Sequence, residues 1–478
     1  MPYHPAIGHL RGQLPRIAFI AALLAAAGTL IALHQEQAAL PSDRWYQLSR
    51  QRVMEADLTW RLAEAIDRLG SGAGAATREQ AQRLYEQAIA MWERRVLTET
   101  PNHAAAYRLG VIYGRRGYAE QASDMLTLAA SIDERHSDFY FAISEIYSDD
   151  ESGDRELRAH AATIAGRDSW IADIALADAY RRLGDEAMLG QVEARRDART
   201  RRFALQFLGI AVGAGTLIGL GIVTLGIALY RRGFTVRERS ARLPFVVPWT
   251  IIDVAEAIAV LLFTMVVGGL FTNMTLGRVL PPEAPLTQPI LMAAQYVLLG
   301  AVTLGVIFYR MRRHSSNPLR TLGWRFERST ELIGAGLAGY GVLLAGLFIF
   351  ALLIGSLLGD AAPFAQTIEE IIGAAQTPGE IAIYFVLVCI FAPILEEIVF
   401  RGYVYGGLRR LMPMRHAVII GAALFAAVHL NAAAFIMIGL IGVMLCYLYE
   451  RTRSLLPGMV AHGVHNGFVL AVMLLQSA

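Results

Sequence analysis

The side chains best suited to chemistry stand together at the end of one apolar run. Glu396, Glu397 and Arg401 follow a hydrophobic stretch that begins near Ile381. Ionisable groups at membrane depth cost a few kcal/mol each, so they are rarely present there without a role. On a helix, Glu397 and Arg401 are spaced and ordered to form an ion pair. Glu396 points about 100° away and is expected to meet a polar group from another helix. The alternative is that all three charges end a membrane segment at headgroup level.

Two later motifs supply candidates for that polar group. In the first, Phe425 and His429 share a helix face, so the phenyl ring can pack beside the imidazole inside an expected membrane span. In the second, His462 and Asn466 share a face near the start of the last span, whereas His465 lies off that face. Either motif alone could be helix-packing polar groups. Three polar motifs in three separate spans favour one shared site.

Composition determines the broad class of the protein. The 478 residues are 55% hydrophobic and 18% charged, with a mean hydropathy of +0.42. A soluble protein carries about 25% charged residues, so the sequence predicts an all-α, polytopic membrane protein with about eight to nine spans. The net charge of +2 gives no indication of nucleic-acid binding. Cys389 and Cys446 lie in apolar runs and imply no disulfide framework.

Hydropathy divides the chain into four parts. Residues 1–35 contain the apolar stretch Ile17–Leu33 and are expected to form an uncleaved membrane anchor; a cleaved signal peptide is the alternative, although no good small-x-small site follows. Residues 36–203 are polar and predict a soluble helical domain. Residues 204–244 form one span and a basic loop, and residues 245–478 form the main membrane domain.

The soluble part shows an internal repeat between about residues 78 and 195. Its clearest unit has an L-G-x-x-Y start followed by small residues, namely Leu109, Gly110, Tyr113, Gly117, Ala122, Leu126 and Ala129. This spacing resembles a degenerate tetratricopeptide repeat, in which small residues let paired helices approach. The alternative is an ordinary helical bundle with chance spacing. The resemblance implies a peptide or protein partner and nothing more specific.

The distribution of arginine predicts the topology. Beyond the anchor, apolar runs of spanning length lie at about 204–230, 249–271, 289–309, 331–358, 380–400, 416–433, 434–449 and 456–475. Arginines cluster in the loops after the second, fourth and sixth of these nine spans, so those loops are expected to be cytoplasmic. The N-terminus is then inside and the soluble domain outside. A run of arginines just before the second span argues the other way, but it ends a long translocated segment, where the rule loses force.

Two more acids lie early in the third span. Asp253 and Glu256 follow Trp249 closely. Acids near the end of a span can lie in the interface or pair with a basic loop. We expect an interfacial position or pairing with a loop arginine rather than a part in catalysis.

The order of the three motifs resembles a known family. E-E-x-x-x-R, then F-x-x-x-H, then H-x-x-x-N, in consecutive hydrophobic segments, is similar to the CAAX-processing and bacteriocin-processing family (CPBP, also called Abi) of intramembrane proteases. The resemblance covers about residues 245–478 and leaves out the anchor and the repeat domain. It implies hydrolysis of peptide bonds within the bilayer.

The resemblance also implies roles for individual residues. Glu396 and His429 match the pair that activates a water molecule, and His462 and Asn466 match the pair that stabilises the oxyanion. Physical chemistry agrees, because amide hydrolysis needs a base for the water and donors for the developing negative charge. Glu397, with Arg401 and Phe425, is expected to support these groups. A zinc version, with Glu396, His429 and His462 as ligands, stays open, although no H-E-x-x-H motif is present.

The leading functional prediction is therefore an intramembrane endopeptidase that acts on membrane-associated proteins or peptides. Its repeat domain would recruit a substrate or a protein partner. The alternative is a membrane scaffold or chaperone that uses a protease-like fold without cleaving; complete motifs favour the enzyme. The anchor layout and the absence of lysine suggest a bacterial inner membrane, with the soluble domain in the periplasm. No nucleic acid is expected as a partner.

Overall fold

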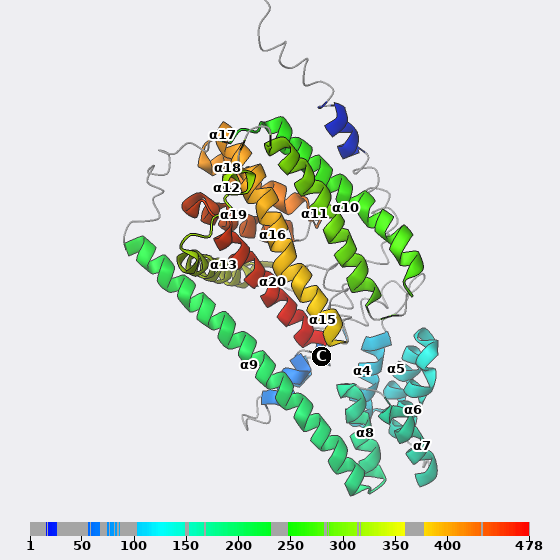
Figure 1. Ribbon diagram of the computed structural model, residues 1–478. Coiled ribbons are helices and arrows are strands. Elements are labelled where there is room, and N and C mark those ends of the chain that lie inside the picture. The colour runs from blue at the N-terminus through cyan, green and yellow to red at the C-terminus, as the bar shows by residue number, and fades with distance from the viewer. Residues whose placement is uncertain are drawn as a thin grey trace, which may run out of the picture. The chain divides into compact units, whose positions relative to one another are not determined.

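The computed structural model of the chain consists of helices in the part that it describes (Figure 1). The described residues are 103–148, 153–166, 169–230, 247–281, 286–312, 317–358, 377–431 and 434–477, with shorter pieces between 16 and 86 and single residues at 284 and 315. The all-α fold expected from composition is confirmed. The expected anchor, Ile17–Leu33, is described only over residues 18–25, so the rest of it lies outside the described residues.

The chain forms two compact units, and the soluble one comprises residues 36–209 and the last few residues. Its helices are α4 (His103–Arg115), α5 (Ala119–Ile132), η1 (Glu134–His136), α6 (Ser137–Tyr147), α7 (Asp154–Ala165), α8 (Trp170–Arg182) and the first part of α9 (Glu186–Tyr230). From α4 to α8, each α-helix packs against the α-helix that follows it.

Small residues of the predicted repeat lie where helices of this unit meet. A Cβ added to Gly110 would come within 2.5 Å of the Leu126 side chain, so glycine allows α4 to approach α5 closely. Ala122 and Ala129 are fully buried on α5. This is the packing that helical repeats use. The assignment of the domain to the tetratricopeptide family stays a prediction.

The second unit is the membrane domain, which includes residues 210–474. It contains the end of α9 and then α10 (Ile251–Val279), α11 (Thr287–Met311), α12 (Pro318–Thr321), α13 (Ser329–Leu358), the helix from Pro378 to Leu411, α18 (Met414–Ala427), α19 (Phe435–Thr452) and α20 (Leu456–Ser477). In the described part of the chain, seven helices are long and apolar enough to cross a membrane. The protein is thus a multi-pass membrane protein.

The helix from Pro378 to Leu411 is not a regular α-helix. It consists of α15 (Pro378–Tyr384), a π-helical segment η4 (Phe385–Phe391), α16 (Ala392–Glu396), a second π-helical segment η5 (Glu397–Tyr405) and α17 (Gly406–Leu411). π-Helical turns are rare and are frequent at functional sites. Glu396 is the last residue of α16 and Glu397 the first of η5, so the two acids stand at a change of helix type.

The expected span at 416–433 is wrong in its length. The helix there, α18, has 14 residues and ends at Ala427. Residues 428–430 form a turn in which Leu430 has a left-handed backbone, with φ of 53°. This conformation ends the helix, because L-residues cannot continue a right-handed helix through it. His429 therefore lies in the turn after α18, not inside a spanning helix.

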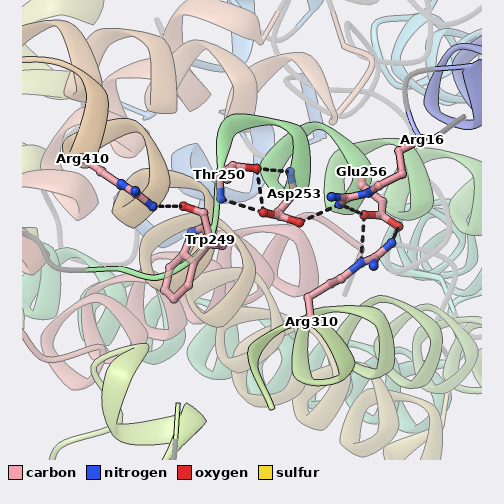
Figure 2. A network of polar contacts seen from close by, with 7 residues as sticks. All are labelled: Arg16, Trp249, Thr250, Asp253, Glu256, Arg310 and Arg410. Carbon is pink, nitrogen blue, oxygen red and sulfur yellow. Dashed lines mark hydrogen bonds and ion pairs between the residues drawn. The ribbon is translucent and has the colours of Figure 1, made fainter. Parts of the chain in front are cut away.

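Ionic networks join the ends of several membrane helices. Figure 2 shows that Arg16 and Arg310 both reach Glu256 on α10, and that Arg16 also reaches Asp253 at 2.6 Å. Glu256 pairs with an arginine, as expected, but Arg310 lies in the last turn of α11 rather than in a loop. Glu450 on α19 forms a similar centre and binds Arg409 of α17 at 3.1 Å. These contacts hold the helix ends in register.

Candidate active site

The two adjacent acids differ in their surroundings. The Glu397 side chain is fully buried, and its Oε1 lies 3.0 Å from Nη1 of the equally buried Arg401. This is the ion pair expected from the sequence. The Glu396 side chain is 22% exposed. Its Oε2 is buried and has no hydrogen-bond donor among the described residues. One acid is therefore held by a cation on its own helix, and the other is available to a ligand.

His462 of α20 reaches both acids. Its Nδ1 lies 3.3 Å from Glu397 Oε1, and its Nε2 lies 3.8 Å from Glu396 Oε2. Glu396 therefore meets a polar group from another helix, as expected. The contact between His462 and Glu397 was not predicted, because it depends on how α20 packs against η5. Glu397 Oε1 thus lies between a guanidinium and an imidazole.

Phe425 of α18 packs against the guanidinium of Arg401 and against the rings of His462 and His429. The guanidinium carbon of Arg401 lies 4.1 Å from the centre of its ring, and the His462 ring meets it edge to face at 5.8 Å. The His429 ring meets it at 4.8 Å, the pairing expected for residues four apart. The first residue of the F-x-x-x-H motif is fully buried. Phe425 therefore limits the rotamers of the groups around it.

One hydrogen bond determines the tautomer of His429. Its Nδ1 lies 2.7 Å from the backbone oxygen of Phe425. A carbonyl oxygen only accepts, so Nδ1 carries the proton and donates. In the neutral ring, Nε2 then has a lone pair and can accept a proton. His429 is exposed, so this nitrogen is accessible from outside the helix bundle.

Asn466 binds the backbone of the helix that carries the acids. Its Nδ2 donates to the Val388 oxygen in η4 at 2.8 Å. The amide nitrogen carries two hydrogens, so one remains for another acceptor. His462 and Asn466 share one face of α20, and both face the α15–α16 helix, beside which α20 lies (Figure 1).

Sequence reasoning missed a glycine that completes the site. A Cβ added to Gly458 on α20 would lie 2.4 Å from Glu397 Oε2, closer than real contacts allow. Any side chain at this position would force the Glu397 carboxylate to move away from its place beside Arg401. The signal in the sequence was weak, because glycine is also common near helix ends where no other group approaches it closely.

His465 takes no part in this arrangement. Its ring packs edge to face against Tyr340 of α13, with ring centres 5.8 Å apart. Its Nδ1 is buried and has no hydrogen-bond partner in the described part of the protein. His465 lies off the helix face that His462 and Asn466 share in the sequence pattern, and in the structure it contacts a different helix from His462.

The donor set does not suit a metal ion. Among the residues that the structure describes, no group of three or more His, Cys, Asp or Glu side chains is arranged to hold one. Both nitrogens of His462 face carboxylates, and His429 Nδ1 is committed to a carbonyl. Glu396, His429 and His462 therefore do not form the zinc shell that the sequence left open.

Comparison with known proteins identifies the part of the chain that carries this site. Residues 378–468, which contain all three motifs, match the family model described as type II CAAX prenyl endopeptidase Rce1-like. The C-terminal part of the chain matches the Rce1-like family. The Rce1-like segment begins at the N-terminus of α15 and ends within α20, so it comprises the helices that supply the acids, both histidines and Asn466.

Two curated relatives agree with the Rce1-like match. The chain is 27% identical to YdiL of Bacillus subtilis (strain 168), whose name describes a membrane peptidase. This match extends over 117 residues, which are 24% of this chain and 46% of YdiL. The chain is also 25% identical to the membrane-embedded CAAX protease MroQ of Staphylococcus aureus (strain USA300). This match extends over 186 residues, which are 37% of this chain and 72% of MroQ. No solved structure matches. The Rce1-like segment and these relatives suggest intramembrane peptidase activity.

Proposed function

We propose that this protein is an intramembrane endopeptidase that hydrolyses peptide bonds of membrane-associated proteins or peptides. The observation that carries the proposal is the position of His462, whose two ring nitrogens face Glu397 Oε1 at 3.3 Å and Glu396 Oε2 at 3.8 Å. Two carboxylates of one helix and an imidazole of another are thereby brought together beside Phe425. Such groups supply proton transfer and oxyanion stabilisation, which amide hydrolysis requires.

Glu396 is the proposed general base. It is the partly exposed acid, and its Oε2 has no donor among the described groups. In the proposed step, Glu396 takes a proton from a water molecule while the water oxygen forms a bond to the carbonyl carbon of the substrate. His429, whose Nε2 has a lone pair, accepts a hydrogen bond from the same water and orients it, while the proton that the water loses goes to Glu396. When the C–N bond breaks, Glu396 returns the proton to the leaving nitrogen, so the site is regenerated.

His462 and Asn466 are the proposed donors to the oxyanion. As an imidazolium, His462 donates through Nδ1 to Glu397 and through Nε2 toward the reacting oxygen. Asn466 offers the second hydrogen of its amide, since the first is bound by Val388. Removal of one such donor typically costs about 2.7–4 kcal/mol of transition-state stabilisation. Glu397, Arg401 and Phe425 hold His462 in place and do not touch the substrate.

The test compares Glu396→Gln with the wild-type protein. The full chain in detergent micelles is incubated with membrane-spanning model polypeptides, and new peptide termini are identified by mass spectrometry. Glu396→Gln, which keeps the size of the side chain, should lower turnover by about 10²–10⁴-fold with unchanged thermal stability. His465→Gln is the matched control and should cleave normally. If Glu396→Gln and the wild-type protein produce the same termini at the same rate, the assignment fails and the scaffold alternative becomes preferable.

The soluble unit is proposed to face the periplasm of a bacterial inner membrane and to recruit a substrate or protein partner. The support is the arginine distribution, which assigns the basic loops to the cytoplasm. Both native cysteines are buried. A cysteine introduced at the exposed Ser123 should react with an impermeant maleimide in spheroplasts, and one at the exposed Ser329 should not. The opposite labelling pattern would invert the proposed topology.

A further inference from the structure

In the helix that carries the acids, one backbone carbonyl lacks the backbone N–H donor that the local hydrogen-bond pattern would provide. At the end of η4, the Ala392 N–H donates to the Leu387 oxygen, five residues back. The next donor in this pattern would be residue 393, which would reach the Val388 oxygen. Residue 393 is proline and has no N–H. The π-helical register and Pro393 together leave the Val388 oxygen without its expected partner.

Asn466 supplies the missing donor from another helix. Its Nδ2 lies 2.8 Å from the Val388 oxygen. Buried carbonyl groups are nearly always hydrogen-bonded, because leaving one unsatisfied is costly. The bond therefore satisfies a carbonyl group of η4 and at the same time attaches α20 to that segment. It also joins the two helices one turn away from the place where His462, also on α20, meets the acids.

The two helices approach each other closely beside this bond. A Cβ added to Gly463 would lie 2.6 Å from the Cys389 oxygen, so only glycine fits there. At Gly467 the distance from an added Cβ to the Cys389 Sγ would be 3.8 Å, an ordinary contact. The small residues of α20 on either side of Asn466 thus pack directly against η4. A small shift of α20 would move His462 relative to the acids.

We infer that Pro393 is a positioning residue: by removing one backbone N–H, it reserves the Val388 carbonyl for Asn466 and so holds His462 at Glu396 and Glu397. We name the combination of Pro393 with the hydrogen bond from Asn466 to the Val388 oxygen the proline latch. The inference rests on the proposed function for its catalytic consequence, but the latch itself is a structural claim. It gives Asn466 a positioning role beside the donor role proposed above.

A substitution at Pro393 should act through Asn466. Pro393→Ala restores an N–H at this position, and in either helical register the Val388 oxygen then gains a backbone donor: from residue 393 in the π register, or from Ala392 in the α register. Asn466 then shares the Val388 oxygen with a backbone donor, which weakens its own hydrogen bond. Asn466→Asp removes the same hydrogen bond by changing its donor, because a carboxylate of the same shape cannot donate to a carbonyl.

The register of α20 can be measured without any substrate. Gly467→Cys places a thiol beside the native Cys389, within reach of a disulfide; Cys446→Ala removes the only other cysteine. Disulfide formation under a mild oxidant is followed by proteolysis and mass spectrometry of the linked peptides. The variants Pro393→Ala, Asn466→Asp and the two combined are compared in this background. Pro413→Ala, an exposed proline before α18, is the matched control.

The latch predicts a specific pattern. Pro393→Ala and Asn466→Asp should each slow cross-linking about tenfold, the ratio that corresponds to about 1.4 kcal/mol, and the combined variant should be no slower than the slower single one. In the native-cysteine protein, Pro393→Ala should lower kcat by a similar factor with KM nearly unchanged. Cross-linking that is unaffected by Pro393→Ala, or effects that simply add, would overturn the inference. If cross-linking follows the pattern but no variant, including the parent, cleaves peptides, the latch stands and the proposed function fails.

Discussion

The fully buried ion pair between Glu397 and Arg401 gives the sharpest prediction on stability. Both side chains have no exposed surface, and Nη1 lies 3.0 Å from Oε1. Arg401→Met keeps most of the side-chain volume but leaves the Glu397 carboxylate buried with only His462 Nδ1, at 3.3 Å, as a polar partner. Breaking a buried pair from one side costs about 3–5 kcal/mol. The stacking of Arg401 on Phe425, at 4.1 Å, adds up to about 2 kcal/mol to the expected loss.

The second substitution separates the charge effect from the packing effect. Glu397→Gln combined with Arg401→Met removes both charges, so no uncompensated carboxylate remains in the interior. Replacement of a whole buried pair by neutral groups is often close to neutral. The double variant should therefore recover about 2–3 kcal/mol relative to Arg401→Met alone. A recovery of this size cannot come from restored packing, since the double variant restores no contact.

The assay is reversible unfolding of the full chain in mixed micelles, with increasing SDS and intrinsic tryptophan fluorescence as the signal. Trp249, which is buried and donates to the Tyr403 oxygen of η5 at 2.9 Å, reports on the membrane domain. The control is Arg328→Met, which removes an exposed pair with Glu331 of 2.7 Å and should cost at most about 0.5 kcal/mol. The reasoning fails if Arg401→Met costs no more than this control, or if the double variant is as unstable as Arg401→Met.

Three further predictions concern single positions. His465→Gln should keep activity within about threefold, since His465 packs on α13 away from the acids; a loss as large as that of His462→Ala in the same peptide assay would assign the third motif differently. Gly458→Ala should abolish cleavage and lower stability by about 1–3 kcal/mol in SDS titration, because the new methyl group overlaps Glu397 Oε2; normal activity would contradict the close approach. In the soluble unit, burial raises the pKa of the Asp133 carboxyl, but hydrogen bonds from two neighbouring side chains lower this pKa by more. The pKa of Asp133 in the folded protein is therefore below its ordinary value. Its contribution to stability is therefore present above the unfolded pKa and lost as pH falls through the folded one. The protection factors of the amides in residues 119–147 should fall with acid less steeply in Asp133→Asn than in the wild-type protein, and identical profiles would refute this.

The sequence predicted those features of the site that depend on local spacing. The pairing of Glu397 with Arg401 follows from residues four apart on a helix. The contact of Phe425 with His429 has the same spacing, although His429 lies in the turn that follows α18. The all-α membrane fold followed from composition. These features need no knowledge of how separate helices meet.

Other features were out of reach because they depend on tertiary packing or on rare backbone geometry. The contact of His462 with Glu397 requires the approach of α20 that Gly458 allows. No glycine or proline marks the end of α18 in the sequence. The left-handed conformation there is adopted by Leu430, although glycine or asparagine usually occupies such a position. An apolar run gives the same hydropathy whether it forms α-helix or π-helix, so the segments η4 and η5 could not be expected.

The change of helix type explains why two adjacent glutamates can serve different purposes. Glu397 opens η5 and points into the core, where Arg401 and His462 compensate its charge. Glu396 closes α16, keeps partial exposure, and is approached only by His462 Nε2 at 3.8 Å among the described cations. A fully buried carboxylate beside a cation is a poor base because the cation favours its ionised form, whereas a partly exposed carboxylate can bind water. The costly buried pair therefore fixes the imidazole, and the imidazole is then positioned over the acid that remains available for chemistry.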